Sequence, residues 1–90
     1  MKFKKIRGVR LSYEQQGLIF FALANYKTQP LAQRRRIDNL IREVCRGDPA
    51  YEGALRAWLL DGRPFEVVSA ESFVNAATLG RLRKKLYESW

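Results

Sequence analysis

Apolar residues recur at helical spacing in three short segments, and this recurrence limits the fold more than any other feature of the sequence. In residues 37–45, 51–59 and 79–90 they return every three or four positions, which places them on one face of an α-helix. Helix-ending signals separate the segments, since Gly47 precedes Asp48 and Pro49, and Gly62 follows the second segment. Short segments that each have one apolar face predict a bundle of short helices.

Two more helices complete the prediction. Ser12 and Gln15 form a capping-box pattern ahead of Leu18–Leu23, which is apolar on every side. A buried strand would also fit so short a run, but the capping box favours a helix. Pro64 can begin another helix, and Asn75 can cap a last one over residues 76–89. The sequence therefore predicts an all-α fold, a small bundle of about five helices.

The apolar run over residues 18–23 also predicts an oligomer. A helix that is apolar all round is expected to be buried all round, and a chain of 90 residues has a small core in which to cover it. We therefore expect a homodimer with this helix at its centre. On this interpretation the chain comprises a basic N-terminal arm, either flexible or a short strand (1–11), a helical core and dimerisation region (12–62) and a helix-turn-helix unit (63–90).

The charge balance indicates a polyanionic partner. Lys and Arg outnumber Asp and Glu by 17 to 9, which gives a formal net charge of +8. Such an excess in a small domain favours nucleic acid. Five aromatic residues lie on predicted apolar faces and not among the cations, which disfavours a surface for stacking single-stranded bases: Tyr13, Tyr26, Tyr51, Trp58 and Phe65. Double-stranded DNA is the expected partner, although charge alone does not separate DNA from RNA.

The composition gives little support to catalysis, metal binding or membrane insertion. There is no histidine, the commonest general base, and the single cysteine, Cys45, falls in an apolar stripe and is expected in the core. No spacing of Cys, His and carboxylates predicts a zinc site. No apolar run approaches the length of about 20 residues that spans a membrane. We expect a cytoplasmic protein that is not an enzyme and uses no metal or cofactor.

The last predicted helix carries the candidate site. Its leucines form one face, while small residues and cations occupy the opposite face. Small residues near a helix N-terminus permit close approach to base edges in the major groove, where arginine can read guanine. The expected base-reading residues are Ala76, Ala77, Gly80 and Arg81. The expected phosphate-binding residues are Asn75, Thr78, Arg83, Lys84 and Lys85 in the same helix, and Arg34, Arg35, Arg36, Lys4 and Lys5 elsewhere.

The segment "VVSAESFVNAATLGRLRKKLY" resembles a helix-turn-helix unit. Val68 and Ser69 stand at the apolar and small positions of the first helix. Val74 and Asn75 match the pair that opens many recognition helices, and Leu79 matches the apolar anchor.

One position departs from that pattern. Phe73 stands where the family usually has glycine in the turn, so a longer turn, or one continuous helix over residues 70–88, is the alternative. In its layout the chain resembles small phage-encoded transcription regulators of the ArpU and RinA type, whose C-terminal unit is similar to the promoter-reading unit of sigma factors. The resemblance implies a sequence-specific DNA-binding protein that regulates transcription, with RNA polymerase as a further candidate partner.

Other interpretations fit the same pattern. The last helix can be a surface helix whose cations only face solvent, and residues 34–36 can be a solvated helix start. A phage packaging protein similar to small terminase subunits is an alternative function, as is a phage assembly protein. A module whose basic face binds an acidic protein is another.

Overall fold

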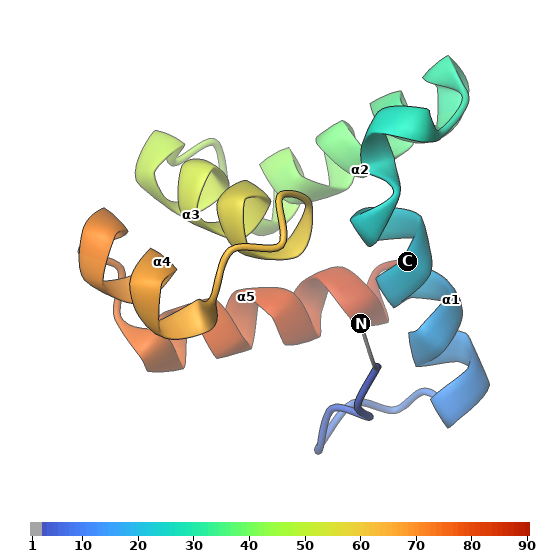
Figure 1. Ribbon diagram of the computed structural model, residues 1–90, viewed down its shortest axis with the longest axis horizontal. Helices are drawn as coiled ribbons and strands as arrows, with labels where there is room; N and C mark the ends of the chain where they lie inside the picture. Colours follow the sequence, from blue (N-terminus) through green and yellow to red (C-terminus); the bar gives the residue numbers. More distant parts are fainter. Residues whose placement is uncertain (1–2) are drawn as a thin grey trace.

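The computed structural model describes residues 3–90, and every regular element in this range is helical (Figure 1). The elements are α1 (Tyr13–Ala24), the 3-10 helix η1 (Tyr26–Thr28), α2 (Leu31–Val44), α3 (Pro49–Leu59), α4 (Phe65–Ser72) and α5 (Ala76–Glu88). The predicted all-α class is confirmed. The predicted arm includes residues 1 and 2, which lie outside the described residues.

Three helices begin at the caps that the sequence predicts. The Ser12 hydroxyl accepts a hydrogen bond from the Gln15 backbone N–H, and the Gln15 side chain accepts one from the Ser12 N–H. The Asp48 carboxylate accepts from the backbone N–H groups of the first turn of α3, and Pro49 occupies that turn. The Asn75 side chain accepts from the Ala77 N–H, 2.7 Å away. Each cap satisfies backbone donors that have no partner within their helix.

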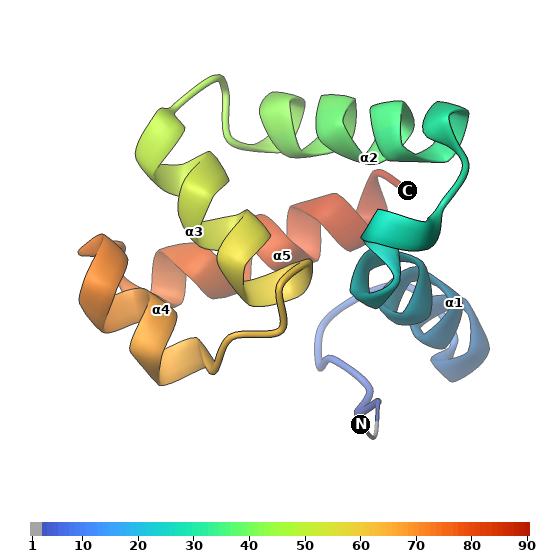
Figure 2. The ribbon, with the colours of Figure 1, turned by 45° about the horizontal axis from the view of Figure 1, so that its top comes forward.

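Helix α5 crosses the middle of the molecule, with α2 running along it and α3 and α4 at its N-terminal half (Figures 1 and 2). Its buried side chains enter two apolar clusters. The larger cluster joins α1, α2, α3 and α5 through buried residues that include Ile19, Ile41, Leu55 and Leu86. The smaller joins α3, α4 and α5 around Leu79. Because both clusters use α3 and α5, packing does not break at the predicted boundary after residue 62.

Within the single chain, helix α1 is buried on one face and exposed on the other. Ile19 and Leu23 lie in the core, but the side chains of Leu18 and Phe21 are 73% and 53% exposed. Leu18 lies four positions after Glu14, and Phe21 lies three positions after Leu18, so all three residues lie on one exposed face. The chain thus leaves an apolar strip on α1, defined here as Leu18 and Phe21.

The basic segment ahead of α1 is held against the helix and forms no strand in residues 3–11. Gln16 is fully buried, and its side-chain oxygen accepts a hydrogen bond from the Ile6 backbone N–H at 2.8 Å. Its side-chain nitrogen donates to the Leu11 carbonyl at 3.1 Å. Phe3 packs on Phe20, with ring centroids 5.3 Å apart. Residues 3–11 therefore form no strand, and the Gln16 side chain pairs with backbone groups of Ile6 and Leu11 in this segment.

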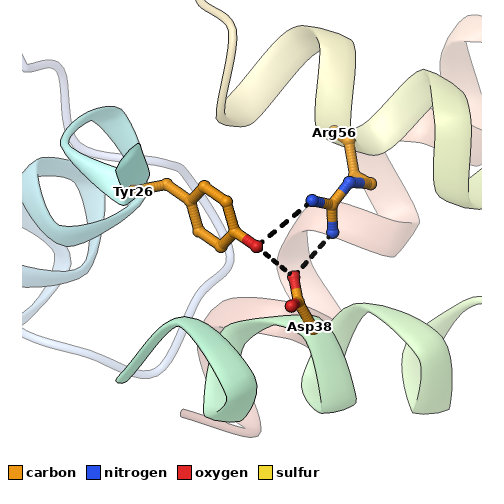
Figure 3. A network of polar contacts seen from close by, with 3 residues as sticks. All are labelled: Tyr26, Asp38 and Arg56. Carbon is orange, nitrogen blue, oxygen red and sulfur yellow. Dashed lines mark hydrogen bonds and ion pairs between the residues drawn. The ribbon is translucent and has the colours of Figure 1, made fainter. Parts of the chain in front are cut away.

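A polar network ties η1, α2 and α3 together (Figure 3). The Asp38 carboxylate accepts hydrogen bonds from the Tyr26 hydroxyl at 2.7 Å and from Arg56 Nη1 at 2.8 Å. Burial alone would raise the pKa of Asp38, but these hydrogen bonds and the charge of Arg56 outweigh it and lower the pKa. Asp38 of α2 thereby links η1 and α3 to its own helix.

A sharp turn separates α4 from α5, so residues 70–88 are not one continuous helix. Phe73 ends α4 with φ 58° and ψ 19°, in the left-handed region where glycine is normally found. Ser69 and Ser72 support the turn, since their hydroxyls donate to the Val74 and Val68 carbonyls. The Phe73 side chain is 94% exposed. Helix-turn-helix units usually have glycine at the position of Phe73. The backbone of Phe73 adopts the conformation that glycine favours.

Replacing Phe73 by glycine should raise the free energy of unfolding by about 1 kcal/mol, because glycine adopts this conformation without strain and little packing is lost. In a chain of this size that gain corresponds to a midpoint about 4–8 °C higher in thermal unfolding followed by circular dichroism. Phe73→Ala is the matched control, since it removes the ring but keeps the strain, and its midpoint should stay close to that of the parent. A lower midpoint for Phe73→Gly would contradict the strained turn.

Candidate nucleic-acid interface

The two faces of α5 differ as the sequence predicts. Leu79, Leu82 and Leu86 are buried, and Trp90, just beyond the helix, packs against the same cluster. Ala77, Arg81, Lys84, Lys85 and Glu88 are exposed on the opposite side. The leucines therefore account for how α5 docks, and the cations are left free of the core. We call the exposed residues Ala77, Arg81, Lys84 and Lys85 the basic face of α5.

The N-terminal turns of α5 present little side-chain bulk. Ala76 and Ala77 are exposed, and Gly80 and Thr78 are half-buried. A methyl group placed on Gly80 would meet no atom within 4 Å. Glycine inside a helix costs about 1 kcal/mol relative to alanine, and nothing in the described chain requires it at this position. The same holds for Gly53 on α3, but at Gly80 the open space lies directly beside Arg81.

Two arginines that the sequence-based site omitted lie on the flanks of the basic face. On one side, Arg10 and Lys84 line a shallow hollow together with Glu88, and the Arg10 N–H donates to the Glu88 carboxylate at 3.5 Å. On the other side, Arg46 and Lys85 line a second hollow, which also contains Glu43. Both juxtapositions depend on tertiary packing, of the N-terminal segment and of α2 against α5. The spacing of residues along the chain gives no signal for them.

Acidic residues limit this surface toward the C-terminal end of α5. Glu88 occupies the last turn of the helix, and Glu43 lies beside Lys85 and Ser89. Both carboxylates would repel a phosphate backbone. The first turns of α5 hold no acidic residue. A polyanion is therefore favoured over the N-terminal and middle turns of the helix.

Arg83 does not belong to the basic face, although the sequence-based site included it. Its guanidinium carbon lies 4.7 Å from the centroid of the Trp58 ring, in the arrangement of a cation–π contact. Its Nε atom is buried and has no hydrogen-bond partner within residues 3–90. Burial lowers the pKa of this guanidinium. Arg83 is partly buried because of its position in the helix. It lies four positions after Leu79 and three before Leu86, next to the buried leucines.

The three arginines of residues 34–36 are not gathered into one patch. Arg36 lies over the Trp90 ring at 4.6 Å and donates to the Trp90 carbonyl. Arg34 is half-buried, and its Nε lacks a partner in the described part of the chain. Arg35 is exposed. Arg36 is thus the member of this run that the structure places against the C-terminal end of α5.

The predicted phosphate ligands of the N-terminal segment also separate. Lys4 and Lys5 are both exposed. Lys4 lines a cavity together with Arg83 and Tyr87, which lie on α5 away from Arg81 and Lys85. Asn75, another predicted phosphate ligand, uses its side-chain oxygen to cap α5. The structure therefore keeps Lys84, Lys85 and the small residues beside Arg81 together and places the other predicted ligands elsewhere.

The single cysteine of the chain, Cys45, is buried. Burial raises the pKa of the Cys45 thiol to about 11, with a further contribution from the carboxylates of Glu52 and Asp48, so this thiol is a poor nucleophile at neutral pH. Within residues 3–90, no three of the Cys, Asp and Glu side chains cluster as metal ligands would. No helix in that range combines the length and apolar character needed to cross a membrane.

Comparisons with protein-family models, curated proteins and solved structures found no match to this chain.

Proposed function

We propose that this protein binds double-stranded DNA through the basic face of α5 and acts as a sequence-specific transcription regulator. The observation that carries the proposal is the exposed grouping of Arg81, Lys84 and Lys85, flanked by Arg10 and Arg46 and preceded by small residues. A helix that enters the major groove needs little bulk where it approaches the bases and cations where it meets phosphates. The net charge of +8 favours the same partner.

The roles within this surface follow from side-chain chemistry. Ala76, Ala77 and Gly80 let the helix approach base edges, and Arg81 offers the two-donor fork that matches guanine. Lys84 and Lys85 carry charge without a directional fork and contact phosphates. Thr78 and the first backbone N–H groups of α5 offer further donors to a phosphate. In this proposal the protein acts by binding and performs no catalysis. It acts in the cytoplasm, where duplex DNA is available.

The turn between α4 and α5 supports this role. A DNA-binding helix-turn-helix places its second helix after a short turn and anchors it with apolar residues against the first. Here Val74 and Leu79 pack with Val68 of α4. The resemblance to phage-encoded regulators extends the proposal to transcription control, with RNA polymerase as a second partner.

The substitutions Arg81→Ala and Lys84→Ala distinguish sequence recognition from phosphate binding. After selection of a preferred site from random duplexes, Arg81→Ala should bind that site about 1–3 kcal/mol more weakly and discriminate less against altered sites. Lys84→Ala should weaken binding to all duplexes by a similar factor. Fluorescence anisotropy with the selected and altered duplexes measures both effects. If neither substitution changes binding, the assignment of this face is wrong.

We propose further that the protein is a homodimer joined through the apolar strip of α1. Leu18 and Phe21 are exposed in the single chain, and a second copy would remove both from water, which favours association.

Light scattering should then give twice the chain mass of 10.5 kDa. The double variant Leu18→Lys/Phe21→Lys should give one chain mass, while Leu31→Lys, at another exposed leucine, should remain dimeric. A monomeric parent protein at high concentration would contradict this interface, and a large ring would favour the packaging alternative.

A further inference from the structure

A cavity of about 400 Å³ lies outside the basic face of α5. The N-terminal segment, α1, the connection between α3 and α4, and α5 all contribute to its walls. We call it the aromatic cavity and define it by six of its lining residues: Phe3, Phe20, Trp58, Phe65, Arg83 and Tyr87. Its volume falls in the range of about 300–1,000 Å³ that is usual for small-molecule sites.

The walls of the aromatic cavity favour a flat apolar ligand. Phe3 and Phe20 contact each other at one side, with ring centroids 5.3 Å apart. Trp58 and Phe65 contact each other at 4.8 Å. A ring placed between these pairs can make offset or edge-to-face contacts with several of them.

Arg83 adds a positive charge to these apolar walls. It forms no ion pair within the described residues, where the ion pairs are Arg56–Asp38 and Arg63–Glu71. Its buried Nε also lacks an acceptor there. The cation–π contact with Trp58 leaves this charge without a negative partner, and an anion in the cavity would supply one.

The other ionisable groups around the cavity do not cancel this preference. Lys4 and Arg63 line it with Arg83, and Asp61 is the acidic residue among its lining residues. Burial raises the pKa of Tyr87 to about 12, so its hydroxyl is neutral near pH 7 and does not repel an anion. The electrostatics therefore favour a ligand with one negative charge.

We propose that the aromatic cavity binds a small aromatic carboxylate. Its ring lies among the aromatic side chains, and its carboxylate accepts hydrogen bonds from the Arg83 guanidinium. Guanidinium and carboxylate match in geometry and form charge-assisted hydrogen bonds. This site does not depend on the proposed DNA binding, because Arg83 and Tyr87 lie on α5 away from Arg81 and Lys85.

The test compares 2-naphthoate with the neutral, nearly isosteric 2-naphthamide on the full chain labelled with ¹⁵N. Titration of 2-naphthoate should give saturable NMR shifts at the Trp58 indole N–H and the Arg83 Nε–H. Its affinity should exceed that of 2-naphthamide by about tenfold or more, the difference expected for a hydrogen bond between charged groups. Equal affinities, shifts confined to the basic face of α5, or no saturation would each overturn the proposal.

Two substitutions test the site from different directions. Arg83→Gln should reduce 2-naphthoate affinity to that of 2-naphthamide and leave the amide unaffected. Ala24→Trp introduces bulk at a residue that lines the cavity and should block both compounds without removing any packed side chain. Ala32→Trp, at an exposed position of α2, is its matched control and should bind as the parent does. If Ala24→Trp binds 2-naphthoate normally, the cavity is not the site, whatever the folding of Arg83→Gln.

Discussion

The affinity of this protein for a short DNA duplex should fall about 500-fold per bound chain when salt rises from about 50 to about 200 mM. The magnitude follows from the five cations of the proposed surface, Arg81, Lys84, Lys85, Arg10 and Arg46. If each neutralises one phosphate, the logarithm of the binding constant falls with the logarithm of salt with a slope of about −4.5 per chain. A partner bound through apolar contacts would show almost no such dependence.

The steepness distinguishes the proposed mechanism from the protein-interaction alternative. Phosphates on duplex DNA condense counterions, which are released when cations of the protein replace them. An acidic protein surface carries fewer and more widely spaced charges, so its salt dependence is shallower. The slope therefore reports on the partner and on the number of contacts together, and a preferred sequence should change the intercept more than the slope.

The largest effect on stability should come from Leu79→Ala. Leu79 is fully buried and joins α5 to α3 and α4 through Ala54, Val68 and Val74. Truncation of such a leucine leaves a cavity and costs about 2–5 kcal/mol. A domain of this size is stable by only about 5–13 kcal/mol, so a large fraction of the total would be lost.

Urea unfolding followed by circular dichroism measures this loss. The midpoint should fall by about 1–3 M, given a slope near 2 kcal/mol per molar urea. Leu31→Ala is the matched control, because Leu31 is exposed and its truncation should change the free energy of unfolding by less than about 0.5 kcal/mol. A small effect of Leu79→Ala would show that α5 is not anchored where the structure places it.

Local features of the fold could be predicted from the sequence because they depend on neighbouring residues. The caps at Ser12, Asp48 and Asn75 pair with backbone groups two or three positions away, and the leucine face of α5 follows from helical period. The same period places Arg83 beside the buried stripe, whereas its charge favours an exposed position. The burial of the Arg83 side chain is determined by its position in the helix more than by its charge.

Other features depend on distant contacts or on competition between local preferences. Arg10 and Arg46 reach the flanks of α5 through segments far away in the sequence, and Gln16 holds the N-terminal segment by hydrogen bonds across five and ten residues. Phe73 adopts a backbone conformation that its own side chain disfavours. The exposure of Leu18 and Phe21 depends on which elements pack on α1, and the spacing of apolar residues within that helix gives no signal for it.

Binding of duplex DNA by the basic face of α5 can be tested through the salt dependence of two triple variants. Arg81→Gln/Lys84→Gln/Lys85→Gln removes three cations of that face. The control Lys27→Gln/Arg35→Gln/Arg42→Gln removes three exposed cations from η1 and α2. The two triple variants therefore have the same net charge.

Anisotropy titrations of the parent and both variants over a range of salt give the slopes. The slope per bound chain should be about −4.5 for the parent and the control, and about −1.8 for the α5 variant. Equal slopes for the two variants, or a parent protein that shows no saturable duplex binding at about 50 mM salt, would contradict DNA binding by this face.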